Sequence, residues 1–187
     1  MDNNVELMKE LLSKIDANLA AETTQSFDLV VRYYSELTEM TIVERNSELY
    51  SLKSTYSLLQ LSATYDIAVK EIFLNLVNAP ISDNVGFATY IEEILKTNIL
   101  NRYMTNIKHN GIKEKFKLTL DEKNPDIQTC ANDITSLIKT RNTIAHELNT
   151  DVKGHNDVGE SLLSVLKYLV WYQNELIEKM HIQKLEA

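Results

Sequence analysis

The 187-residue sequence has few of the residues that make turns and cross-links. It contains four glycines, two prolines and one cysteine. So few glycines and prolines in a chain of this length favour long helices. Because Cys130 is the only cysteine, no internal disulfide can form, and a reducing cytoplasm is the expected environment. We interpret Cys130 as a buried, inert thiol, since nothing near it in the sequence would activate it.

Long apolar runs and an excess of positive charge are lacking as well. No apolar run approaches the roughly 18 residues of a membrane-spanning helix, so no membrane span is expected. The first residues, MDNNVELMKELL, do not have the charged and apolar regions of a signal peptide. The formal net charge of −8 argues against broad electrostatic binding to nucleic acid, although it is compatible with a local basic groove.

Apolar residues recur with helical spacing along the chain, and no stretch alternates for long enough to predict a strand. The sequence therefore predicts a single all-α domain over residues 1–187, built as an antiparallel helical bundle. Residues 1–50 are predicted to form an N-terminal helical part, and residues 51–182 the core bundle. Helices are predicted over 4–20, 24–49, 51–77, 85–107, 126–148 and 160–180, with a break near Thr41. A turn is predicted at His109-Asn110-Gly111, a short helix or a basic loop over 112–125, and a polar loop over 151–159.

One local cluster of positive charge lies between residues 102 and 117, where Glu114 is the only acidic residue. Such a cluster is compatible with a solvated helix face or with a groove that contacts phosphates, and both interpretations stay open. The candidate RNA-contacting residues are Arg102, Lys108, Lys113, Lys115 and Lys117, together with Lys139.

The stretch IKTRNTIAHELN, residues 138–149, carries polar groups in what otherwise reads as a core helix. On a helical wheel of about 100° per residue, Arg141 lies at the centre of the apolar stripe. Asn142 and His146 are four residues apart, on a neighbouring shoulder of the helix. A charge in the middle of an apolar stripe is costly unless it is paired. The stripe consists of Ile134, Leu137, Ile138, Ile144, Ala145 and Leu148.

Asp66 has a similar position on the helix predicted over 51–77. If Asp66 and Arg141 meet, a bidentate ion pair would satisfy both charges. In the alternative, Asp66 pairs with Lys70 and the long side chain of Arg141 reaches solvent. The spacing alone does not choose between the two. The apolar residues around Asp66 are Leu52, Leu59, Ala63, Val69, Phe73 and Val77.

The polar groups of the 138–149 stretch suit the cleavage of an RNA phosphodiester. Arg141 offers a fixed planar cation to a phosphate, His146 can move a proton near neutral pH, and Asn142 can orient the histidine or bind a phosphate oxygen. The ribose 2′-hydroxyl is then the nucleophile, so no metal or cofactor is expected. His146 is also compatible with a structural role at the end of its helix. No metal-ligand spacing occurs among His109, His146, His155 and His181.

The segment RNTIAH resembles the R-N-x-x-A-H form of the motif of HEPN domains. The segment LSATYDIAVKEIF is similar to an earlier helix of that family, on which an aromatic residue and an acid stand together, here Tyr65 and Asp66. The likeness extends to an all-α chain with the motif on a late helix and one more helix after it. It implies a metal-independent endoribonuclease, a toxin or anti-phage defence effector that leaves a 2′,3′-cyclic phosphate and a 5′-hydroxyl.

The resemblance also implies a cytoplasmic homodimer in which two motif helices form one composite site. By position, Arg141 would contact the scissile phosphate, His146 would take part in proton transfer, and Asn142 would support them. An RNA substrate and an antitoxin or defence-system partner protein are implied as well. Leu148 replaces the tyrosine that one family branch offers to nucleotidyltransferase antitoxins, which argues against that mode of neutralisation. A catalytically inactive helical scaffold and a protein that binds nucleotides without cleavage are the alternatives.

Overall fold

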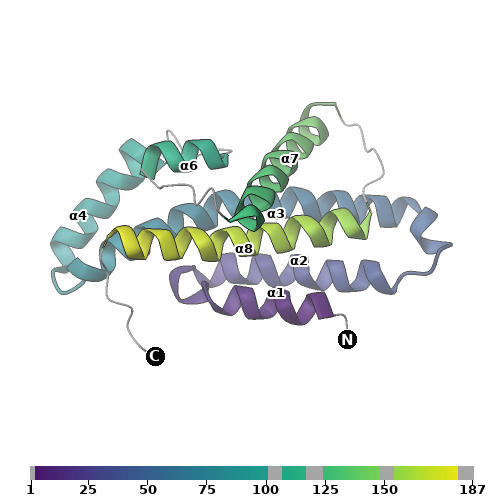
Figure 1. Cartoon of the computed structure of the whole chain (residues 1–187), viewed down its shortest axis with the longest axis horizontal. Coiled ribbons are helices and arrows are strands. Elements are labelled where there is room, and N and C mark those ends of the chain that lie inside the picture. The colour runs from purple at the N-terminus through teal and green to yellow at the C-terminus, as the bar shows by residue number, and fades with distance from the viewer. Residues whose placement is uncertain (1–2, 101–106, 117–123, 148–153, 181–187) are drawn as a thin grey trace.

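The computed structural model describes residues 3–100, 107–116, 124–147 and 154–180, and every regular element within them is helical (Figure 1). The predicted all-α class is therefore confirmed. Within the same ranges, no helix combines the length and the apolarity needed to cross a membrane. The α-helices are α1 (Asn3–Ser13), α2 (Ala21–Glu39), α3 (Glu48–Asn78), α4 (Val85–Leu95), α6 (His109–Phe116), α7 (Pro125–Glu147) and α8 (His155–Lys179). The shorter elements are η1 (Asp16–Asn18), η2 (Glu44–Asn46), η3 (Ala79–Ile81) and η4 (Lys96–Leu100).

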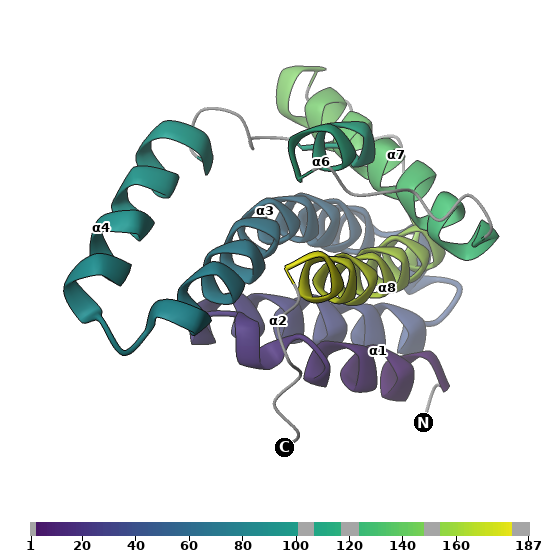
Figure 2. The same cartoon turned by 60° about the vertical axis from the view of Figure 1, so that its left-hand side comes forward.

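The helices form layers around α3 and α8, which lie side by side at the centre (Figure 2). α1 and α2 cover one side of this pair, α6 and α7 cover the other, and α4 flanks α3. Buried side chains of the N-terminal helices, such as Met8 and Phe27, belong to the same apolar core as Leu61 of α3 and Leu166 of α8. The N-terminal helices α1 and α2 thus share one core with α3, α7 and α8 of the predicted core bundle.

The two helices that carry the candidate site were predictable from their periodicity. The helix predicted over 51–77 is α3, which begins where the side chain of Ser47 accepts a hydrogen bond from the backbone N–H of Tyr50 at 3.2 Å. The helix predicted over 126–148 is α7. These two elements carry Asp66 and Arg141, so their confirmed extents fix the backbone of the candidate site.

The polar loop predicted over 151–159 is wrong in its second half, because α8 already begins at His155. The hydroxyl of Tyr50 accepts a hydrogen bond from the backbone N–H of His155 at 2.8 Å, and the Asp157 carboxylate accepts one from Gly154 at 2.8 Å. Gly159 is not a loop glycine: a Cβ atom there would lie 2.5 Å from Cε2 of Tyr34. The glycine therefore serves the close approach of α2 to α8.

The turn predicted at His109-Asn110-Gly111 is also wrong, because these residues form the first turn of α6. His109 and Ile112 are both buried, which anchors that turn in the core. A histidine, an asparagine and a glycine in sequence resemble a turn locally, but the burial of the histidine is decided by residues far away in the chain.

In three of the predicted helices, the continuous α-helix ends before the last residue of the predicted range. The helix predicted over 4–20 ends at Ser13, and η1 follows it. The helix predicted over 24–49 ends at Glu39, so the break predicted near Thr41 is confirmed. The helix predicted over 85–107 passes into the π-helical turn η4 at Lys96. Apolar spacing continues through the breaks after Ser13 and at Lys96, which is why periodicity alone did not reveal those two.

Candidate functional site

α3 and α7 bring Asp66 and Arg141 together. Nη1 of Arg141 lies 3.6 Å from Oδ2 of Asp66, so the ion pair forms as the first of the two arrangements predicts. Asp66 is buried, with 8% of its surface exposed, whereas the Arg141 side chain is 30% exposed. The pair is a single contact, longer than a hydrogen bond, and not the bidentate arrangement. Nη1 of Arg141 is buried beside this carboxylate, so the exposed surface belongs to the rest of the arginine side chain.

Arg141 marks the point at which α7 leaves the bundle. Leu137 and Ile138, just before it, are buried, whereas Ile144 is half-buried and Ala145 is exposed. Figure 1 shows the C-terminal end of α7 rising away from α3 and α8. The apolar stripe of the sequence is thus only partly covered within one subunit. The guanidinium lies at the edge of the core, where the cost of burying its charge is reduced.

The neighbouring polar residues of α7 lie on its exposed side. Asn142 and Lys139 are both exposed, and their spacing of three residues places them on the same flank of the helix. His146 belongs to the last turn of α7, one turn beyond Asn142, but its side chain lies outside the described residues, as does Leu148. The geometry therefore joins Arg141 to Asp66 and sets Asn142 next to them on the solvent side.

A buried aromatic cluster supports the segment of α3 that carries Asp66. Tyr65 is fully buried and packs edge-on against Tyr168, with 6.2 Å between the ring centroids. The Tyr168 hydroxyl lies 2.7 Å from Nδ1 of His109, and the His109 ring centroid lies 5.7 Å from that of Trp171. Burial raises the pKa of Tyr65 well above its ordinary value. Burial also lowers the pKa of His109, and the charge of Lys113 lowers it further.

Sequence reasoning missed this cluster because it assigned His109 to a turn. The last helix does carry a signal for it, since Tyr168, Trp171 and Tyr172 recur at intervals of three and four residues. That spacing marks one face of α8 as aromatic and core-facing. The partner of that face, the first turn of α6, has no comparable local signature.

The predicted basic cluster is described in part. Lys108 and Lys115 are exposed and Lys113 is half-buried, all on or beside α6, which packs against α7. Arg102 and Lys117 lie outside the described residues. Three of the predicted lysines are therefore placed on the same side of the bundle as the candidate site.

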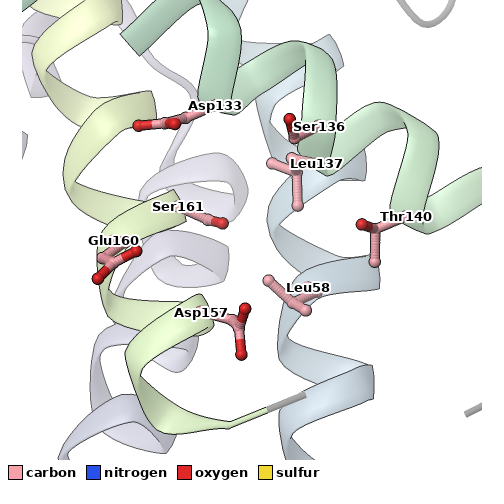
Figure 3. A pocket seen from close by; sticks show the side chains of 8 residues that line it. All are labelled: Leu58, Asp133, Ser136, Leu137, Thr140, Asp157, Glu160 and Ser161. Carbon is pink, nitrogen blue, oxygen red and sulfur yellow. The ribbon is translucent and has the colours of Figure 1, made fainter. Parts of the chain in front are cut away.

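A polar pocket of about 170 Å³ lies on the other flank of α7, between α7, α3 and α8 (Figure 3). Asp133, Asp157 and Glu160 line it, and Asp133 accepts a hydrogen bond from Ser164 at 2.6 Å. These carboxylates make this flank of α7 negative, so it would repel an anionic ligand. In the described part of the chain, no group of three or more His, Cys, Asp or Glu side chains is arranged to hold a metal ion.

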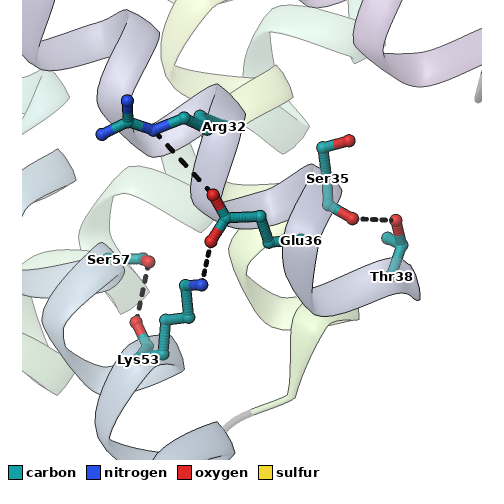
Figure 4. A network of polar contacts seen from close by, with 6 residues as sticks. All are labelled: Arg32, Ser35, Glu36, Thr38, Lys53 and Ser57. Atoms are coloured by element: carbon teal, nitrogen blue, oxygen red, sulfur yellow. Dashed lines mark hydrogen bonds and ion pairs between the residues drawn. The ribbon is translucent and has the colours of Figure 1, made fainter. Parts of the chain in front are cut away.

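The surroundings of Arg141 differ from those of Arg32, which lies on the polar surface of α2. Nε of Arg32 lies 4.0 Å from Glu36, whose other oxygen accepts a hydrogen bond from Lys53 of α3 (Figure 4). The Arg32 side chain is 65% exposed, and ion pairs of this kind contribute little to stability. Arg141, by contrast, is paired with a buried carboxylate on the core side of its helix.

No protein-family model, curated protein or solved structure matches the chain. The class that the fold and the site define is an all-α bundle with a partly exposed arginine–aspartate pair where one helix leaves the core. Its function is therefore argued from these side chains.

Proposed function

We propose that the protein is a metal-independent endoribonuclease of HEPN type, acting as a toxin or an anti-phage defence effector. The observation that carries the proposal is the Arg141–Asp66 pair. The buried carboxylate holds one side of the guanidinium, while the exposed part of the arginine is accessible to a phosphate. A purely structural helix has no need of a charge on its apolar stripe, because an apolar side chain there would be at least as stable.

In the proposed reaction, the ribose 2′-hydroxyl attacks the adjacent phosphorus and the bond to the 5′-oxygen breaks. The products are a 2′,3′-cyclic phosphate and a 5′-hydroxyl. Arg141 stabilises the negative charge on the phosphoryl oxygens in the transition state. His146 transfers the proton, and Asn142 supports the site by hydrogen bonding. Asp66 is a positioning residue that acts through Arg141.

We propose that the active form is a homodimer in which the outer ends of two α7 helices face each other. Ile144 and Ala145 leave the apolar stripe of α7 partly uncovered. Leu49, Leu52 and Tyr56 add exposed apolar surface along the first half of α3, the helix on which α7 packs. A twofold partner would cover both surfaces and supply a second arginine and histidine to the same site.

We propose that RNA reaches this site along the Lys139–Asn142 flank of α7 and the lysines of α6. The acidic pocket on the other flank disfavours the opposite approach. Single strands or loops are the expected substrates, because their phosphates and ribose hydroxyls are accessible to side chains on a convex helical surface.

The test is an RNA cleavage assay in excess chelator. The wild type is expected to cut RNA, and Arg141→Ala and His146→Ala should each lose on the order of 10²-fold or more in rate. Circular dichroism should show that both variants remain folded. Arg32→Ala is the matched control, since it removes a surface arginine away from the site. No cleavage of transfer, ribosomal or messenger RNA by the wild type would instead favour an inactive scaffold.

A further inference from the structure

α4 is an apolar helix that buries none of its residues. Its 11 residues are apolar apart from Gly86, Thr89, Glu92 and Glu93, yet each of them is half-buried or exposed. The helix flanks the bundle beside the C-terminal half of α3 (Figure 2). A helix of three turns is marginal in water unless its apolar face is covered. The apolar face of α4 is therefore expected to be covered by residues that lie outside the described part of the subunit.

The side of α4 that faces α3 carries Glu92, and Lys96 follows on the same side at the start of η4. Glu92 and Lys96 line a groove of about 540 Å³ together with Ile67 and Lys70 of α3. Glu92 forms an ion pair with Lys96 and accepts a hydrogen bond from Asn78 at 3.2 Å. Glu92 and Lys96 are thus paired within their own subunit.

The other side of α4 has the spacing of a helix–helix seam. Phe87, Tyr90, Ile91 and Ile94 recur at intervals of three and four residues, so they lie on one face of the helix. Phe87 is 48% exposed and Tyr90 is 60% exposed, while the two isoleucines are half-buried. We call these four side chains the α4 stripe.

We propose that the α4 stripe binds the α4 stripe of a second copy of this chain, with the two helices antiparallel. The stripe is symmetric about the midpoint between Tyr90 and Ile91. A twofold axis through that point sets Phe87 against Ile94 of the partner subunit, and Tyr90 against Ile91 of the partner subunit. The same four residues thus form both halves of the contact.

Charge favours a second copy as the occupant. The α4 stripe carries no charged side chain, so two copies meet there without like-charge contact despite a net charge of −8 on each chain. In an antiparallel pair, the positive end of each helix dipole lies beside the negative end of the other. An anionic membrane surface would require unpaired cations beside the stripe, and Lys96 is already paired with Glu92.

The α4 contact is separate from the proposed α7 contact, because α4 follows the C-terminal end of α3 whereas Leu49 and Leu52 lie at its start. It does not depend on the ribonuclease proposal. Two self-complementary surfaces on one subunit lead to tetramers or longer assemblies. Four side chains form less than the usual interface of about 800 Å² per partner, so the association is expected to depend on concentration.

The test is sedimentation velocity of the full chain over a concentration series. The double variant Phe87→Glu/Ile94→Glu should lack one association step that the wild type shows. Val85→Glu is the matched control, because Val85 is 74% exposed but lies on the far side of α4 from the stripe, so it should sediment like the wild type. Identical sedimentation of the wild type and the double variant at every concentration would overturn the proposal.

Oxidative cross-linking tests the register of the pair. A mixture of Phe87→Cys and Ile94→Cys chains should form a disulfide-linked dimer, whereas Phe87→Cys alone should not. The buried Cys130 is not expected to react, and the wild type controls for it. Efficient cross-linking of Phe87→Cys to itself, or none in the mixture, would overturn the antiparallel arrangement.

Discussion

At the scale of single residues, the feature that distinguishes this chain is a guanidinium on the apolar stripe of a helix. Its sequence position suggested a buried charge, and the structure shows a charge at the edge of the core, fixed by Asp66. Removing one member of such a pair leaves the other charge in a partly apolar site, which costs more than the pair itself contributes.

Asp66→Ala should therefore lower the free energy of unfolding by about 1–3 kcal/mol, because Arg141 is left without its carboxylate. The combined variant Asp66→Ala/Arg141→Met should recover part of this stability, since no unpaired charge remains. Urea denaturation of the wild type and the variants measures both effects. An Asp66→Ala protein that is as stable and as active as the wild type would show that the pair is incidental.

His109 should make the fold sensitive to mild acid. Its pKa is lowered by burial and by Lys113, whereas the unfolded chain has the ordinary value of about 6.5. As the pH falls below that value, the unfolded state takes up a proton more readily than the folded state, so stability decreases. His109→Phe should weaken this decrease between about pH 7 and pH 5 in urea denaturation.

Two comparisons isolate the effect of His109. Tyr168→Phe removes the hydroxyl next to Nδ1 but keeps the imidazole buried, so it should retain the acid sensitivity. The pKa of His155 is also lowered by burial. His155 is present in every variant, so its contribution drops out when the pH dependence of a variant's stability is compared with that of the wild type. The same pH dependence in His109→Phe and the wild type would contradict the assignment.

At the scale of elements, periodicity predicted the helices that have one long apolar face and failed at ends that are fixed by distant contacts. α3 and α7 followed from their stripes, and Cys130 is buried as predicted, with burial raising the pKa of its thiol. The starts of α6 and α8 depend on His109 in the core and on Tyr50 of α3, contacts that leave no local signal.

Gly159 offers a test at this scale. Gly159→Ala should lower the free energy of unfolding by about 1–3 kcal/mol, because the added Cβ meets the Tyr34 ring at the contact of α2 with α8. Gly86→Ala is the matched control within a helix: the nearest atom, Oδ1 of Asn84, would lie 3.9 Å away, so stability should stay equal or rise slightly. Equal stability of the two variants would show that α2 and α8 are not packed this closely.

At the scale of the whole molecule, an acidic protein is proposed to bind RNA through one local basic surface. α6, which carries Lys113 and Lys115, lies on the same side of the bundle as α7, and α1 and α2 lie on the opposite side (Figure 2). The sequence located this cluster, but which face carries it follows only from the packing of α6. The net charge of −8 implies that binding is local and sensitive to salt.

Charge reversal tests this surface. Lys113→Glu, Lys115→Glu and Lys117→Glu, combined in a His146→Ala background that prevents cleavage, should weaken RNA binding. The slope of log Kd against log salt should also become shallower, by about 0.7 for each phosphate that the lysines no longer neutralise. Fluorescence anisotropy measures both, and Lys9→Glu/Lys14→Glu, on α1 and directly after it, is the control. An unchanged slope would exclude this surface from RNA binding.

The most direct test of the central claim is the chemistry of one cleaved bond. An RNA that the wild type cuts at a mapped position is resynthesised with a single 2′-deoxyribose on the 5′ side of that bond, and both RNAs are incubated with the protein in excess chelator. We expect a 2′,3′-cyclic phosphate and a 5′-hydroxyl from the unmodified RNA, and no cleavage at the modified position. Continued cleavage there, or a 5′-phosphate product, would contradict the proposed reaction.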